Sequence, residues 1–518
     1  MDKNILFGLN IFLSGGLENI LITFRAINLN LQMSVLVFIG LLTIPFTGVL
    51  LYRYTKKLSQ KKPLSLSLKH LLISIIILLI FQISLGLFCK ETNLKNLRYI
   101  YKNEQKLPLF YSFLPSLKKE IVLAKNIKIL KSENSLLDKI NKINFEHVKR
   151  PNIYIFIVET LRKDFITKEI ASNIYDFEKQ NISFNKSYSA ANASQISWYS
   201  IFHSKHPIFW SENNKNSKHG SLPLNILKKL DYKINVFTSA EMSYFHMNNL
   251  IFGENNSLAN SYNDFSLISS DPSTRDNIVI DNLTKKILET KDKQSNVFIT
   301  FLDSTHSEYS WPKDFEAKFS PYSDKINYIT LSQDKTKLQL VKNRYKNSIN
   351  FIDHLFGKFL TFLKTNNLYD DSIIVFTGDH GEEFFEDGSL FHSSHLNNYQ
   401  IQVPIIFKLL NQNEKRFDIS SHIDIFPTIL SQLIPDKNFN DIFDGRSIFD
   451  KNHNPFIISV NQNGALTPNE LIIIKDSSQL KGKFISKKNL VFRIDETINI
   501  DERNIENELQ YSLDSILE

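Results

Sequence analysis

Cysteine is almost absent from this chain of 518 residues: Cys89 stands alone, so no intramolecular disulfide bond can form. This does not fix the compartment, because many exported domains fold without disulfides. Internal repeats, low-complexity tracts and nucleic-acid-binding motifs are also lacking, and the formal net charge of +7 is scattered rather than gathered in a basic arm. We therefore expect no nucleic-acid partner, and the charge fits a membrane neighbour at least as well. The length allows two or three units with their own cores.

Two uncharged apolar runs occupy residues 33–52 and 71–89. A membrane-spanning helix needs ~20 such residues. The segment between the runs contains only basic charges: Arg53, Lys56, Lys57, Lys61, Lys62 and Lys69. The positive-inside rule places that segment in the cytoplasm and the chain after Cys89 outside. The sequence thus predicts a multi-pass protein of the cytoplasmic (inner) membrane with its catalytic part extracytoplasmic. Buried core helices are the alternative for these runs.

An earlier apolar segment, residues 5–24, contains Glu18. A carboxylate at the centre of a membrane helix costs roughly 2.5–3.5 kcal/mol, so this segment either spans the bilayer or lies at its interface. No short apolar run is followed by a small-residue cleavage site, so no cleavable signal peptide is expected. Residues 1–94 are therefore the predicted transmembrane part. Residues 95–150 form a charged connector, packed at the membrane surface or against the next domain, or simply solvated.

From Pro151 onward, short apolar runs alternate with helical patterns. Residues 152–158, 297–302, 373–376 and 403–407 are continuous apolar runs typical of central parallel strands, and residues 341–364 form an amphipathic helix. This alternation predicts a doubly wound α/β domain over residues 151–450. Residues 451–518 contain short strands and turns, which predict a small antiparallel sheet closed by a helix from about residue 505.

Candidate metal ligands and catalytic groups follow the predicted strands. Glu159 comes after the first strand, His306 after the strand at 297–302, and Asp379 and His380 after the strand at 373–376. Ligands of open α/β sheets bind at the carboxyl ends of strands, and an Asp–His pair can hold a divalent metal. The alternatives are a solvated loop at Asp379 and His380, and a helix amino terminus at Glu159. His306 alone would more often be structural or solvated.

Ser194 stands near the start of an apolar helix within residues 189–207. Free backbone N–H groups there favour an anionic phosphate, and a hydroxyl held by a metal can act as a nucleophile. Helix capping by Ser194 or Ser197 is the alternative. Two further histidines, His392 and His395, lie in a predicted loop, and the sequence does not decide which of them serves the site.

The pieces IFIVET, SQISWYSIFHSKHP, FLDSTHSEY, VFTGDHGEEF, VPIIF, HIDIFPTIL and DGRSIF follow one another in this order over residues 152–449. In that order they resemble the sulfatase-like branch of the alkaline phosphatase superfamily. Among its members, the membrane-anchored phosphotransferases are most similar: lipoteichoic acid synthases, phosphoglycerol transferases and lipid A phosphoethanolamine transferases. Those transferases usually have Thr as the nucleophile. Sulfatases need Cys or Ser followed by Pro and Arg, which residues 194–198 lack, and this weighs against sulfate-ester hydrolysis.

The resemblance implies a site residue by residue. It implies one or two divalent ions, Zn²⁺ or Mn²⁺, with Glu159, Ser194, Asp379 and His380 as metal ligands. It makes Ser194 the nucleophile, and His306 and His392 the contacts to the phosphate or a second metal.

The expected reaction moves phosphoethanolamine or phosphoglycerol from a membrane phospholipid to an envelope glycan or lipid through a phospho-Ser intermediate. A phosphoester hydrolase, and a catalytically silent membrane-tethered protein that binds lipid or a partner, are the alternatives.

Overall fold

The computed structural model describes residues 133–145, 148–210, 218–291, 295–326, 331, 335–410, 416–450, 457–462, 468–475, 478–484 and 492–498, and helical residues at 43, 46–50, 52–54 and 56–57. The chain divides into two compact units, Met1–Lys119 and Glu120–Glu518. The apolar segments 5–24 and 71–89 and the predicted helix from residue 505 lie outside the described residues, and segment 33–52 overlaps them only in part. Within the described ranges, no helix combines the length and the apolar character that a bilayer crossing requires.

The strands of the second unit are β1 (Asn152–Val158), β2 (Ser183–Tyr188), β3 (Lys233–Thr238), β4 (Ser261–Asp264), β5 (Asn296–Leu302), β6 (Ser372–Gly378), β7 (Ile405–Lys408), β8 (Arg416–Ser421), β9 (Ile457–Gln462), β10 (Pro468–Lys475), β11 (Ser478–Phe484) and β12 (Phe492–Ile498). Its α-helices are α6 (Glu133–Lys142), α7 (Ser172–Gln180), α8 (Ser194–His203), α10 (Leu222–Lys229), α11 (Met247–Phe252), α12 (Pro272–Thr290), α13 (Lys335–Thr365), α14 (Asn398–Ile401) and α15 (Ile425–Leu433). Short 3₁₀ turns are η2 (Lys163–Phe165), η3 (Pro207–Phe209), η4 (Tyr244–His246), η5 (Glu254–Asn256) and η6 (His422–Asp424).

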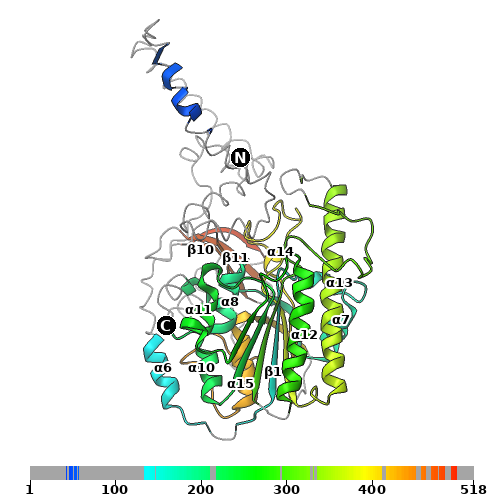
Figure 1. Cartoon of the computed structure of the whole chain (residues 1–518). Helices are drawn as coiled ribbons and strands as arrows, with labels where there is room; N and C mark the ends of the chain where they lie inside the picture. The colour runs from blue at the N-terminus through cyan, green and yellow to red at the C-terminus, as the bar shows by residue number, and fades with distance from the viewer. Residues whose placement is uncertain are drawn as a thin grey trace. The chain divides into compact units, whose positions relative to one another are not determined.

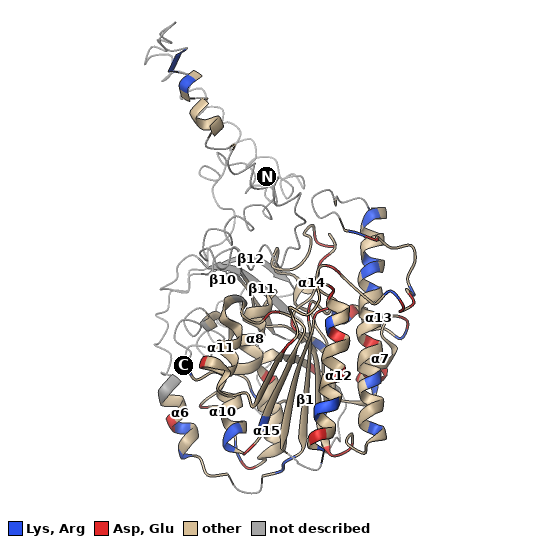
Figure 2. Ribbon diagram, viewed as in Figure 1, with Lys and Arg blue, Asp and Glu red and all other residues tan. Residues whose placement is uncertain are grey.

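A six-stranded sheet with the order β4-β3-β5-β1-β6-β7 forms the centre of the second unit (Figure 1). All neighbouring pairs are parallel except β6 with β7, which is antiparallel, so the sheet is mixed. The strands of this sheet carry almost no charge, whereas the helices around them do (Figure 2). This confirms the predicted α/β class. The last strand of this sheet, β7, begins at Ile405 rather than at the predicted residue 403, because Pro404 has no N–H group for a ladder hydrogen bond.

The core lies on both faces of this sheet, because successive side chains of a strand point to opposite sides. Ile153, Ile155 and Ile157 of β1 belong to the cluster covered by α6, α8, α10, α11 and α15. Tyr154 and Phe156 belong to the cluster covered by α7, α12 and α13. Both faces being buried explains why β1 is continuously hydrophobic from Ile153 to Val158.

Helix α6 lies within the stretch expected to be a connector. Its Leu136 and Ile140 are buried in the same core as α10. Lys229 at the end of α10 donates to the carbonyl oxygens of Ile140 at 2.9 Å and Asn141 at 2.6 Å, which caps the carboxyl end of α6. Residues 133–142 therefore pack on the α/β domain.

The four-stranded sheet β12-β11-β10-β9 is antiparallel, as predicted for the carboxyl-terminal part. Its edge strand β9 contacts the segment that leads into α8. Val460 N–H donates to the Ala190 carbonyl oxygen at 3.0 Å, and Asn192 N–H donates to the Val460 carbonyl oxygen at 3.3 Å. The small sheet thus supports the loop before Ser194.

Candidate active site and metal centre

Three adjacent strands deliver the acidic groups of the site. In the order β5-β1-β6, Asp303 follows β5, Glu159 follows β1 and Asp379 follows β6. The ends are tied together: Thr160 N–H donates to Asp379 Oδ1 at 2.9 Å, and the Thr305 hydroxyl donates to the Glu159 carbonyl oxygen at 2.5 Å. Because parallel strands end at one edge, carboxylates far apart in sequence converge there.

Ser194 is the first residue of α8, and its side chain does not cap the helix; the N-cap position is Ala193. Ser194 Oγ lies 3.1 Å from Glu159 Oε1 and 3.1 Å from His380 Nε2. Ser197 Oγ donates to the Ala191 carbonyl oxygen instead. The structure therefore places the predicted nucleophile against two of the predicted metal ligands.

The donor atoms around Ser194 suit a cation. His380 Nδ1 faces the carbonyl oxygen of Gly381 at 3.0 Å and so carries the hydrogen, which leaves Nε2 with a lone pair. That Nε2 lies 3.3 Å from Glu159 Oε1, another acceptor. Donors bound at ~2.0–2.2 Å around a tetrahedral Zn²⁺ lie roughly 3.3–3.6 Å apart. A divalent ion therefore fits between these groups.

Asp379 supplies the strongest sign that the site suits a positively charged ligand. Its Oδ1 accepts from the N–H groups of Thr160 and His380, whereas its Oδ2 is buried without a hydrogen-bond partner. Burial, with the charge of Glu159 beside it, raises the pKa of Asp379 well above its ordinary value. Burial also opposes ionisation of Glu159, but in the metal-free site the hydrogen bond and charge of the protonated form of His380 outweigh it and hold the Glu159 pKa below its ordinary range. A bound cation would take the place of that proton between His380 Nε2 and Glu159. A metal at Oδ2 would satisfy the Asp379 carboxylate.

His392, rather than His395, lies at the site. Its ring centroid is 4.4 Å from that of His380, and its Nδ1 lies 3.2 Å from Glu382 Oε1. Glu159, His380 and His392 each offer a ligand atom, and these atoms lie within 4.8 Å of one another. His392 is thus placed to bind a metal, and the contact with phosphate predicted for it stays a prediction. His395 lies 3.6 Å from Asp387 instead.

His306 lines the partly open side of the site. Its ring centroid is 5.9 Å from that of His392, and its Nδ1 lies 3.7 Å from Asp303 Oδ1. Burial raises the pKa of Asp303 to about 6, although His306 and Arg275 favour its ionised form. Arg275 Nη2 donates to Asp303 Oδ2 at 2.6 Å.

Two supporting residues, Glu382 and Arg162, are not among the site residues predicted from the sequence. Glu382 is fully buried; it receives a hydrogen bond from the Tyr309 hydroxyl at 3.0 Å on one oxygen and faces His392 with the other. Arg162 is buried between the rings of Phe165 and Tyr399, at 4.7 and 4.9 Å, and donates to the Glu382 carbonyl oxygen at 2.8 Å. From the sequence alone, both would be expected to be charged side chains of solvated loops.

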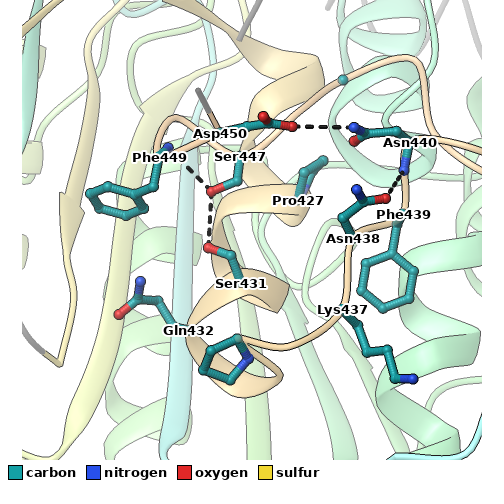
Figure 3. A pocket seen from close by; sticks show the side chains of 12 residues that line it. Pro427, Ser431, Gln432, Lys437, Asn438, Phe439, Asn440, Ser447, Phe449 and Asp450 are labelled. Atoms are coloured by element: carbon teal, nitrogen blue, oxygen red, sulfur yellow. Dashed lines mark hydrogen bonds between the residues drawn. The ribbon is translucent and has the colours of Figure 1, made fainter. Parts of the chain in front are cut away.

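A separate cavity of about 330 Å³ lies beside α15 (Figure 3). Its lining includes Phe439 and Phe449 but none of the site residues. Its polar groups bind one another: Asn440 donates to Asp450 at 3.2 Å. It is not part of the candidate active site.

The family model described as Sulfatase matches residues 151–433. Among curated relatives, the phosphoethanolamine transferase EptA of Escherichia coli is 31% identical over 115 residues, 22% of this chain and 20% of EptA. The aligned parts span only a fifth to about a quarter of the length of the curated relatives that the chain matches.

Two solved structures share the fold at low identity. The lipoteichoic acid synthase LtaP from Listeria monocytogenes superimposes with a TM-score of 0.51 at 16% identity, over 73% of this chain and 97% of LtaP. The phosphonate monoester hydrolase of Agrobacterium radiobacter gives 0.52 at 12% identity, over 71% of this chain and 95% of the hydrolase. One fold thus accommodates a synthase and a hydrolase, so it does not distinguish the two reactions.

Proposed function

The chain belongs to the sulfatase family, within the alkaline phosphatase superfamily, and from that premise we propose that it is a metal-dependent phosphotransferase. It moves a phospho-head group, phosphoethanolamine or phosphoglycerol, from a membrane phospholipid to a glycan or lipid of the cell envelope. The observation that carries the proposal is the position of Ser194 Oγ, 3.1 Å from both Glu159 and His380. The likeness to the phosphoethanolamine transferase EptA and the lipoteichoic acid synthase LtaP supports transfer, because both of those proteins are named for group-transfer or synthase activities.

Glu159, Asp379 and His380 would hold the ion, with Ser194 or His392 completing the set. When bound, a divalent metal lowers the pKa of a hydroxyl ligand and neutralises charge that develops on phosphoryl oxygens. The chemistry of the donors, two carboxylates and one imidazole, suits Zn²⁺ or Mn²⁺.

In the first half-reaction, Ser194 Oγ attacks the phosphorus of the phospholipid. The Oγ–P bond forms, the P–O bond to diacylglycerol breaks, and the proton lost by Ser194 leaves on the diacylglycerol hydroxyl. His306 and His392, whose side chains are 34% and 22% exposed, reach the open side of the site and can orient the phosphate or carry that proton.

In the second half-reaction, an acceptor hydroxyl attacks phospho-Ser194 and restores the free serine. The hydrolase alternative differs only in the use of water as the acceptor, and the phosphonate monoester hydrolase fold is the observation that favours it.

The apolar runs 33–52 and 71–89 would place this domain on the outer side of the cytoplasmic membrane, as a multi-pass protein. Tethering there keeps the site beside its lipid donors at high effective concentration.

The test is metal content and intact mass of the chain after incubation with phosphatidylethanolamine or phosphatidylglycerol, with Ser194→Ala as the control. The proposal expects near-stoichiometric metal and an adduct on Ser194 whose mass names the head group. Metal with released head group but no transfer to an acceptor would favour the hydrolase. Neither metal nor adduct would refute the proposal and favour a silent binding protein.

A further inference from the structure

The most exposed large apolar side chains of the described α/β domain are adjacent in sequence. Leu267 is 78% exposed and Ile268 is 59% exposed, in the turn that follows β4. Single exposed apolar residues are common on soluble proteins. Two neighbours at one turn, both directed into solvent, require a more specific reason.

This turn is held by hydrogen bonds and by a core contact. Ile268 N–H donates to the Phe265 carbonyl oxygen at 3.2 Å, and Phe265 packs against the core beneath. Arg275 Nη1 donates to the Ser269 carbonyl oxygen at 2.8 Å, while Nη2 of the same guanidinium donates to Asp303. The exposed pair is therefore presented in a fixed conformation and is linked through one buried arginine to the acid beside His306.

The turn lies at the catalytic edge of the sheet. Strand β4 is parallel to β3, and β3 is parallel to β5, so β4 ends at the same edge as the strands that carry Asp303, Glu159 and Asp379. Helix α12 begins there at Pro272 and runs back along the sheet, which places Leu288, another exposed leucine at 44%, near the opposite edge.

A basic helix end stands at the same edge. Helix α13 packs against α12 and ends shortly before β6 begins, so its amino-terminal end lies at the catalytic edge. Its first 12 residues, from 335 to 346, include five basic residues and no acidic one: Lys335, Lys337, Lys342, Arg344 and Lys346. Figure 1 shows α13 extending past α12, and Figure 2 shows basic residues on that part of the helix.

We infer that Leu267, Ile268, Lys335 and Lys337 form a membrane-docking face that contacts the surface of a bilayer containing anionic phospholipid. The inference rests on the proposed function, in which the donor is a membrane phospholipid. A specific protein partner would need about 800 Å² of buried surface on each side, far more than two aliphatic side chains supply. A bilayer interface needs only a few inserted apolar side chains together with lysines near anionic head groups.

The test uses the full chain in phosphatidylglycerol vesicles that contain spin-labelled lipid. In a Cys89→Ser background, a fluorophore on Ser270→Cys reports on the docking face, and a fluorophore on Leu288→Cys is the matched control on the same helix–turn unit. We expect quenching several-fold stronger at position 270 than at 288. Equal quenching at both positions would overturn the inference.

Two further variants separate the parts of the face. Leu267→Ser with Ile268→Ser should reduce quenching at position 270 to the control level. Lys335→Glu with Lys337→Glu should reduce it in phosphatidylglycerol but not in phosphatidylcholine vesicles. Unchanged quenching in the serine variant would show that Leu267 and Ile268 do not contact the bilayer. Unchanged quenching in the glutamate variant would show the same for Lys335 and Lys337.

The quenching experiment does not depend on catalysis, so it distinguishes a wrong docking face from a wrong proposed function. If the enzyme is active, the ratio of kcat/KM on vesicle lipid to kcat/KM on a soluble phosphodiester should fall about tenfold in the apolar double variant. An unchanged ratio would contradict docking as a step in substrate capture.

Discussion

Replacing Asp379 with asparagine should change the stability of the metal-free and metal-loaded protein in opposite directions. The carboxylate is fully buried; Oδ1 accepts two backbone N–H groups, whereas Oδ2 has no partner and lies 3.7 Å from His380 Nε2. Asparagine keeps the Oδ1 contacts and replaces Oδ2 with an NH₂ group, a donor beside the acceptor atoms of His380 and Glu159. In wild type without metal, the unpaired Oδ2 atom costs about 1–3 kcal/mol of stability. The substitution removes this buried acceptor, so metal-free Asp379→Asn should be more stable than wild type by about that amount.

With metal, the order should reverse. A ligand that binds only the folded state adds about 2.7 kcal/mol of stability at a concentration of 100 times its Kd. The wild-type chain should gain this stability, and Asp379→Asn should gain little of it because the anionic ligand is lost. The assay is chemical unfolding followed by near-ultraviolet circular dichroism, in chelator and then with Zn²⁺ or Mn²⁺. A variant that is less stable than wild type in chelator, or that gains as much from metal, would refute the reasoning.

Three other changes test the surroundings of the site. Glu382→Gln, which alters the carboxylate that faces His392, should weaken metal affinity by about 10- to 100-fold in a chelator competition, and unchanged affinity would exclude an orienting role. Gly381→Ala should destabilise the fold by about 1–3 kcal/mol in urea unfolding, because the new Cβ would lie 2.1 Å from the Tyr399 carbonyl oxygen. Burial lowers the pKa of His422 to about 3, whereas in the unfolded chain this pKa is about 6.5. The neutral imidazole therefore contributes stability that is fully present above pH 6.5 and is lost as the pH falls toward 3. Between about pH 6.5 and 5, wild type should lose about 1.5 kcal/mol more than His422→Gln, and parallel pH curves would contradict this.

The sequence predicts the elements of the sheet well because both of its faces are buried. A strand packed on both sides must be apolar along most of its length, and the predicted strand at residues 152–158 matches β1 residue for residue. The order of the strands is not accessible in the same way. In the sheet, β1 lies between β5 and β6, although β2, β3 and β4 separate β1 from β5 in the sequence. Only tertiary packing decides this order.

The site was predictable where chemistry follows an apolar strand directly. Glu159, Asp379 and His380 stand at such positions, and the structure brings them together with Ser194. Glu382 was missed because its burial depends on contacts with residues outside its own segment. For α6 the sequence left open whether the connector packs at the membrane, packs against the domain or is solvated, because its few apolar residues become a core only against α10.

Residues on both sides of the domain boundary predicted near residue 450 hold the active site in place. The loop before Ser194 is held on one side by Val460 of β9 and on the other by His422, which accepts from Ala190 N–H at 3.4 Å through Nδ1. His422 Nε2 donates to the Gly378 carbonyl oxygen at 2.9 Å, directly before Asp379. One neutral imidazole therefore fixes the nucleophile loop relative to the metal-binding loop, since protonation at Nδ1 would remove its acceptor. The small sheet and the segment after β8 are thus structural parts of one active site, and the spacing between Ser194 and His380 depends on residues that contact neither of them.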